Sequence, residues 1–262
     1  MNEGLKPLSS GGWSAGMGNL LERELSAWFR TSRWWKYSLG WMALINGMVF
    51  IFPTIAGVAE GSGATDPYRT ALEAYLNMAA LVASIGVVLT MQDAIIGERE
   101  SGTLAWVMSH PVSRTSFLLA KAVGGGTGLL LTALALPALL AYWQVGFLSG
   151  QLPEPVWFLA ATGMVGLQLV FYLSLMLLLG VVFQQRLAAA GLGLAVLFAG
   201  PLVPAVLPAL GRLFPWQMPQ MAMVVAVYGH MPSEFGLPLL ATALWAGLFL
   251  SAALWQLGRM EL

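Results

Sequence analysis

The chain has 262 residues, of which 58% are hydrophobic and only 9% are charged, and its mean hydropathy is +0.76. Soluble domains carry roughly a quarter charged residues, because their surface has to be solvated. The composition therefore excludes a water-soluble globular protein and indicates an integral membrane protein. The chain also lacks cysteine, which excludes disulfides, thiolate metal sites and cysteine nucleophiles.

The N-terminal region precedes any long apolar run. Residues 1–18 are rich in glycine and serine without periodicity, which predicts a flexible tail. Residues 19–36 place apolar and charged side chains at helical spacing, which predicts an amphipathic helix lying in the membrane interface. Trp28, Trp34 and Trp35 are the expected anchors at the level of the lipid headgroups.

The remainder, 37–262, reads as one transmembrane domain with six runs that lack Asp, Glu, Lys and Arg. A helix needs around 20 apolar residues to cross a hydrocarbon core of roughly 30 Å, and inside lipid the backbone has to bond itself. The predicted fold class is therefore an all-α integral membrane protein. The six expected spans are 37–59, 74–97, 117–146, 156–184, 187–210 and 236–258.

The placement of basic residues predicts the orientation. With the N-terminus inside, ten Lys and Arg residues fall on the inner side and only Arg69 and Arg212 on the outer side. Both termini are therefore expected in the cytoplasm. Residues 211–235 are also poor in charge, but three prolines and several polar residues interrupt them. We expect an external or re-entrant hairpin there, rather than a seventh span.

The sequence offers no catalytic constellation. A nucleotide-binding phosphate loop needs Gly-Lys followed by Ser or Thr, and Lys6, Lys36 and Lys121 are followed by Pro, Tyr and Ala. Glycines 124, 125, 126 and 128 are instead expected to serve helix packing. His110 and His230 have no partner at metal-ligand spacing, so we expect no metal site and no enzyme activity. Any ATPase must be a separate chain.

The most distinctive segment is the inner loop 98–116, between the second and third spans. A charged cluster ends the second span, a short helix follows from about Thr103 to Ser109, and Pro111 stops it. Ser113 is the expected N-cap of the next helix. The short helix is expected to expose Leu104, Trp106, Val107 and Met108, either to lipid or to a partner protein, and the flanking charges favour a partner.

This segment resembles the signature of the ABC type-2 exporter permeases, through Glu98, Gly102-Thr103-Leu104, Pro111-Val112-Ser113-Arg114 and Lys121. His110 and Trp106 depart from the usual residues. The resemblance implies a permease subunit that docks on a separate ATP-binding-cassette ATPase, which holds the ATP and magnesium, so that this chain needs no cofactor. The implied ATPase contacts are Glu98, Arg99, Glu100, Gly102, Thr103, Leu104, Trp106, Val107, Pro111 and Arg114.

The resemblance also implies a dimer with a second copy or with a related permease, in the plasma membrane of a prokaryote. Lipid is the expected surrounding, and no nucleic-acid partner is expected. Two other classes are compatible with the residues alone. One is a non-transporting membrane anchor or scaffold subunit of a larger complex, and the other is an ATP-independent channel or carrier for apolar cargo.

Overall fold

The computed structural model describes residues 14, 16–60, 66–109 and 112–260. Within them every regular element is a helix, which confirms the all-α class. Most of the predicted N-terminal tail lies outside the described residues. Six helical segments are long and apolar enough to cross a membrane, as predicted. They are Arg33–Ile55, Pro67–Glu100, Arg114–Ser149, Pro155–Val182, Arg186–Val206 and Ser233–Arg259.

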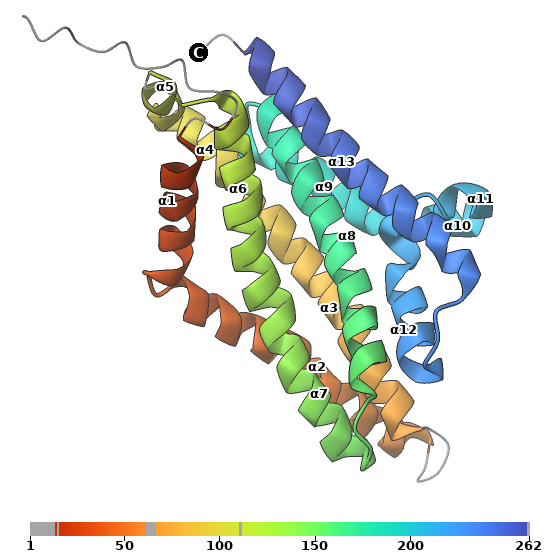
Figure 1. The fold of residues 1–262 in the computed structure, drawn as a ribbon. Coiled ribbons are helices and arrows are strands. Elements are labelled where there is room, and N and C mark those ends of the chain that lie inside the picture. The colour runs from red at the N-terminus through yellow and green to blue at the C-terminus, as the bar shows by residue number, and fades with distance from the viewer. Residues whose placement is uncertain (1–13, 15, 61–65, 110–111, 261–262) are drawn as a thin grey trace, which may run out of the picture.

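Some spans are single helices and others are built from more than one helical element (Figure 1). The first span is the single helix α2 (Arg33–Glu60), the fourth is the single helix α8 (Pro155–Val182), and the sixth is mainly α13 (Gly236–Arg259). In the second span, α3 continues into α4 through Gln92, whose backbone stays helical. The second span consists of α3 (Pro67–Met91) and α4 (Asp93–Glu100). The third consists of α6 (Arg114–Leu129), a π-helix (Leu130–Ala135) and α7 (Leu136–Ser149). The fifth consists of α9 (Arg186–Ala199), a 3-10 turn (Gly200–Leu202) and α10 (Val203–Val206).

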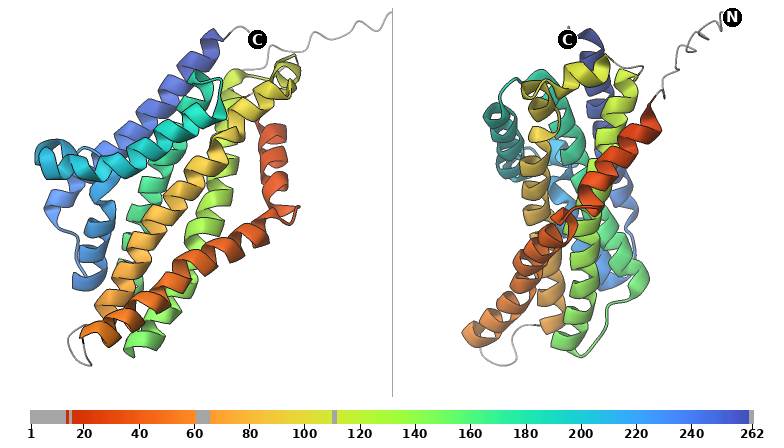
Figure 2. Two further views of the ribbon diagram at one scale, coloured as in Figure 1. Left: turned by 180° about the vertical axis from the view of Figure 1, so that it is seen from behind. Right: turned by 90° about the vertical axis from the view of Figure 1, so that its left-hand side faces the viewer.

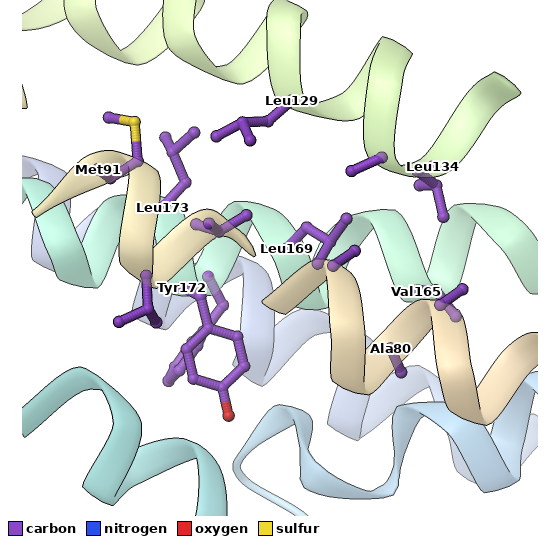
Figure 3. Close-up of a cluster of buried hydrophobic side chains, with 14 of the residues drawn as sticks. Ala80, Met91, Leu129, Leu134, Val165, Leu169, Tyr172 and Leu173 are labelled. Atoms are coloured by element: carbon purple, nitrogen blue, oxygen red, sulfur yellow. The ribbon is translucent and has the colours of Figure 1, made fainter. Parts of the chain in front are cut away.

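Helix α8 is the centre of the bundle. It packs against α3, α12 (Met218–Tyr228) and α13. In its most apolar stretch of 18 residues, 72% is buried, whereas the corresponding stretch of the first span is 22% buried. Figure 3 shows Val165, Leu169 and Leu173 of α8 among side chains from α3 and from the third span, while the Tyr172 ring points away from the third span. Small residues such as Ala80 on α3 let the helices approach closely. The most central helix is thus also the most apolar.

Side-chain hydrogen bonds supplement this packing between two pairs of spans. Asn46 of α2 donates to Gln144 Oε1 of α7 at 2.8 Å and to the Pro137 carbonyl at 3.0 Å. Gln168 of α8 lies 3.3 Å from Ser84 Oγ of α3. All four side chains are buried, where an unpaired polar group would be costly in lipid. These bonds therefore fix α2 against α7 and α8 against α3.

The segment between the fifth and sixth spans folds back on the bundle. After α11 (Pro208–Gly211), a 3-10 turn (Pro215–Gln217) leads into α12, which packs on α8 and α3. With 11 residues α12 is too short to cross a hydrocarbon core, so the count of six spans is consistent with it. Gly229, at φ +65°, ends α12 and turns the chain toward α13.

Several predicted boundaries are wrong. The second span begins at Pro67 rather than at 74. The expected single helix 19–36 is two helices, because α1 (Met17–Phe29) ends in a turn and α2 already begins at Arg33. The fifth span ends at Val206 rather than 210, where the chain leaves helical geometry at Leu207, next to Pro208. The inner loop is also shorter than 98–116, since 98–100 belong to α4 and the residues from Arg114 onward to α6.

Candidate functional site

The inner loop forms a compact elbow of α4, α5 (Thr103–Met108) and the start of α6 (Figure 1). Gly102 joins α4 to α5 in the left-handed conformation, with φ +71°, which other residues rarely adopt. Ser113 caps α6 as predicted, because its Oγ accepts from the Ser116 backbone N–H at 3.0 Å. His110 and Pro111 lie outside the described residues.

A cluster of ion pairs connects this elbow to α1 and to α6. Lys121 of α6 lies 2.7 Å from Glu24 of α1 and also pairs with Glu98 of α4, while Arg23 lies 3.2 Å from Glu98. The Lys121 and Glu98 side chains are only 11% and 12% exposed. Two cations and two carboxylates thus neutralise one another in a largely desolvated place, where the loss of one partner is costly.

A glycine seam brings α1 close enough for these contacts. A methyl group at Gly124 would lie 2.5 Å from the Glu24 Cβ, and one at Gly128 would overlap the Trp28 indole. The expected packing role of these glycines is therefore confirmed, with α1 as the partner of α6 (Figure 2). Trp28 is 7% exposed, so its assignment as a headgroup anchor is wrong. Trp34 and Trp35 are exposed, at 42% and 44%, and stay candidates for that role.

Two arginines fasten the elbow to the ends of other spans. Arg99 donates to the carbonyls of Val181 and Phe183, both at 3.1 Å, at the end of α8. Arg114 donates to the carbonyls of Leu257 and Gly258 at 2.8 and 2.6 Å, at the end of α13. The last carbonyls of a helix lack helical partners and carry partial negative charge, so a guanidinium is a fitting ligand for them.

A more exposed ion-pair group joins the elbow to α9. Arg186 lies 2.7 Å from Asp93 Oδ1, and its Nε donates to Glu100 Oε2 at 2.9 Å. These side chains are 44% to 54% exposed, so solvent weakens their attraction. Together with the contacts described above, this group connects α4 to α1, α6, α8 and α9. The start of α6 is connected to α13 through Arg114.

Helix α5 presents a different face from the one expected. Leu104 and Val107 are 1% and 4% exposed and belong to the hydrophobic core, so the prediction that they are available to a partner is wrong. Residues three apart share one face of a helix, and this face turns inward. Trp106 lies on the outward face and is 64% exposed, beside Ala105, which is also exposed and was not among the predicted contacts.

The predicted ATPase contacts thus differ in their surroundings. Glu98, Arg99, Glu100 and Arg114 bond to other helices of the same chain, as described above, and Leu104 and Val107 are buried. Gly102 and Trp106 face outward, Thr103 is half-buried, and Pro111 lies outside the described residues. Across the described residues there is no group of three His, Cys, Asp or Glu side chains able to hold a metal ion. The arrangement can carry mechanical load between helices.

Six apolar spans, joined at one end by the contacts of the elbow, define a multi-pass membrane protein. Residues 72–229 match the ABC-2 family transporter protein family, and the chain belongs to that family. It is therefore a membrane permease subunit of an ABC transporter, as the resemblance predicted.

Two relatives carry the name "Probable ABC transporter permease protein NosY". The one from Pseudomonas aeruginosa is 30% identical over 209 residues, which cover 68% of this chain and 72% of the relative. The one from Stutzerimonas stutzeri is 28% identical over 193 residues, covering 71% of this chain and 66% of the relative.

Proposed function

We propose that this permease exports its cargo, and that a separate ATP-binding-cassette ATPase drives it by docking on the outward face of α5. Each half of the transporter pairs one permease with one ATPase, and two permeases, either two copies or one with a relative, enclose the pathway. ATP and magnesium are bound by the ATPase. The membrane is the plasma membrane of a prokaryote, with both termini and α5 in the cytoplasm.

One observation carries the proposal. Every charged side chain flanking α5 that the resemblance selected is bonded to another helix, while the large apolar side chain of Trp106 projects outward. An exposed tryptophan is the kind of anchor that carries binding energy at protein interfaces. A push on α5 is passed through these bonds to α1, α8, α9 and α13.

The test is Trp106→Asp in the permease co-expressed with its ATPase. We expect the ATPase to be lost on co-purification, because a carboxylate replaces the buried anchor of the interface, and substrate-dependent ATP hydrolysis to fall with it. The variant should fold, since Trp106 is exposed. Its thermal unfolding midpoint in detergent provides that control.

Ala105→Ser is the matched control on the same exposed face and should retain the ATPase. Retention of the ATPase and of coupled hydrolysis by Trp106→Asp would show that α5 is not the docking element. A non-transporting scaffold subunit predicts that outcome.

A further inference from the structure

A polar cavity of about 310 Å³ lies beside the elbow, enclosed by α1, the start of α2, the α3–α4 junction, α6 and the start of α9. Three carboxylates and three cations line it, so its wall carries no net charge. They are Glu24, Asp93 and Glu98, and Arg33, Lys121 and Arg186. A balanced wall with separated charges favours a ligand that is itself zwitterionic over a simple anion or cation.

Most of these charged side chains are already paired with one another, and two groups remain that could bind a ligand. Lys121 is held by Glu24 and Glu98, and Arg186 by Asp93 and Glu100. Glu98 Oε2 is buried and has no hydrogen-bond partner among the described residues. Arg33 is exposed at the start of α2 and forms no ion pair with another described residue. The cavity thus offers one buried acceptor and one free guanidinium.

These two groups define the chemistry of the missing ligand. A buried carboxylate oxygen without a donor is costly, so the deep end calls for an N–H group. A primary ammonium supplies three such donors in a small volume. The guanidinium matches a phosphate oxygen, which it can bind with two parallel hydrogen bonds. The ligand therefore carries a primary ammonium close to a phosphodiester.

The position of the cavity indicates where that ligand comes from. Arg33 is followed by the exposed Trp34 and Trp35 and by Lys36, a combination that is enriched at the headgroup level of a bilayer. Trp28 and Tyr37, which also line the cavity, pack edge to face with ring centroids 5.6 Å apart. A molecule entering beside Arg33 at this level is a membrane lipid.

We propose that this cavity binds the headgroup of an ethanolamine phospholipid, with the ammonium at Glu98 Oε2 and the phosphate at Arg33. The lipid bridges α2 and α4, two segments that the ion pairs described above do not join directly. It occupies a position from which it stiffens the connection between the first span and the elbow.

The experiment places the full-length permease in nanodiscs of equal parts ethanolamine, choline and glycerol phospholipids with identical acyl chains. After mild detergent extraction, the lipids retained by each chain are counted by mass spectrometry. We expect the ethanolamine lipid to be enriched over the choline lipid, because a trimethylammonium group cannot donate a hydrogen bond. Arg33→Gln should lower the retention of the ethanolamine lipid about fivefold, because a partly solvated charge-assisted hydrogen bond to its phosphate is lost.

The matched control is Arg30→Gln, which removes an exposed arginine that does not line the cavity and should leave the enrichment unchanged. If Arg33→Gln does not fold, Ala94→Leu fills the cavity without altering its charges and should abolish the enrichment. Equal retention of ethanolamine and choline lipids would overturn the proposal and indicate water in the cavity. Preferential retention of the glycerol lipid would also overturn it, since that lipid is an anion without an ammonium.

A final arm separates the lipid from a soluble molecule with the same headgroup. Glycerophosphoethanolamine is titrated against the purified permease in detergent, in competition with the retained ethanolamine lipid. Displacement only at a large excess supports a lipid ligand anchored by its acyl chains. Displacement at a concentration equal to that of the lipid would overturn the lipid assignment in favour of a soluble compound.

Discussion

Two regions of the helix bundle are held together by different kinds of contact. At the α5 end, ion pairs and arginine–carbonyl bonds connect the elbow to surrounding helices. Nearer the middle of α8 and α13, aromatic rings connect the helices instead. Phe214 stacks on Trp216 and Trp245 with centroids 4.6 and 5.2 Å apart, and Trp245 continues to Phe249 at 5.5 Å.

The two kinds of contact respond differently to movement. Hydrogen bonds and ion pairs weaken steeply when their geometry changes, so the elbow and the helix ends bonded to it are expected to move as one body. Stacked rings are less directional and tolerate small sliding. We therefore expect the ion-paired region to pass on a displacement of the elbow and the aromatic region to accommodate it by small shifts of the rings. Three variants test this comparison.

The largest effect is expected from Lys121→Ala, at the centre of the ion-pair cluster. It leaves Glu24 and Glu98 facing each other in a largely buried site, which should destabilise the fold by about 3 kcal/mol. The measurement is the thermal unfolding midpoint in detergent. Adding Glu98→Gln to Lys121→Ala should recover part of the loss, because one of the two carboxylates that face each other is then neutral. An unchanged midpoint in the single variant would mean that the cluster does not hold the elbow.

Gly128→Ala should have an intermediate effect. Its methyl group overlaps the Trp28 indole, so α1 has to move off α6 at a cost of about 2 kcal/mol. Gly163→Ala is the matched control, since no neighbouring atom lies within 4 Å of the added methyl group. If both variants unfold at the same temperature, the seam is looser than the structure indicates. A second change, Trp28→Leu, should relieve the overlap in Gly128→Ala.

The smallest effect is expected from Asn46→Leu, far from the elbow. It removes the donor of Gln144 Oε1, so this buried amide oxygen is left without a partner, at a cost of about 0.6 kcal/mol by analogy with similar bonds in membrane helices. The double variant Asn46→Leu with Gln144→Leu should recover the wild-type midpoint, because neither buried side-chain amide is left over. A loss as large as that of Lys121→Ala would contradict the special importance of the ion pairs at the elbow.

The spans were predictable because lipid imposes a length and a composition that the sequence has to show. The Ser113 cap was predictable because the contact is local, reaching only three residues along the chain. Trp28 was misassigned because its partner, Gly128, lies a hundred positions away, and no local periodicity connects the two. The glycine stretch was correctly assigned to helix packing, but nothing in it specified which helix.

The elbow shows the same limit in its charges and in its short helix. The flanking charges were assigned to a partner protein, yet Arg99 binds carbonyls more than eighty residues onward. Such a contact leaves no signature in the sequence, because any helix end offers the same carbonyls. The inward face of α5 was equally hidden, since in a helix of six residues the buried face depends on what packs beneath it.

The fastening of α1 and α13 beside the elbow has a practical consequence for handling the protein. Glu24 and Leu257 both belong to helices bonded to the segment that flanks α5. Affinity tags or fluorescent proteins fused to either terminus would therefore compete for space with whatever binds there. A label introduced near Gln151, in the exposed turn between α7 and α8, would leave that face clear. Because the chain contains no cysteine, a single Gln151→Cys substitution would give a unique attachment point.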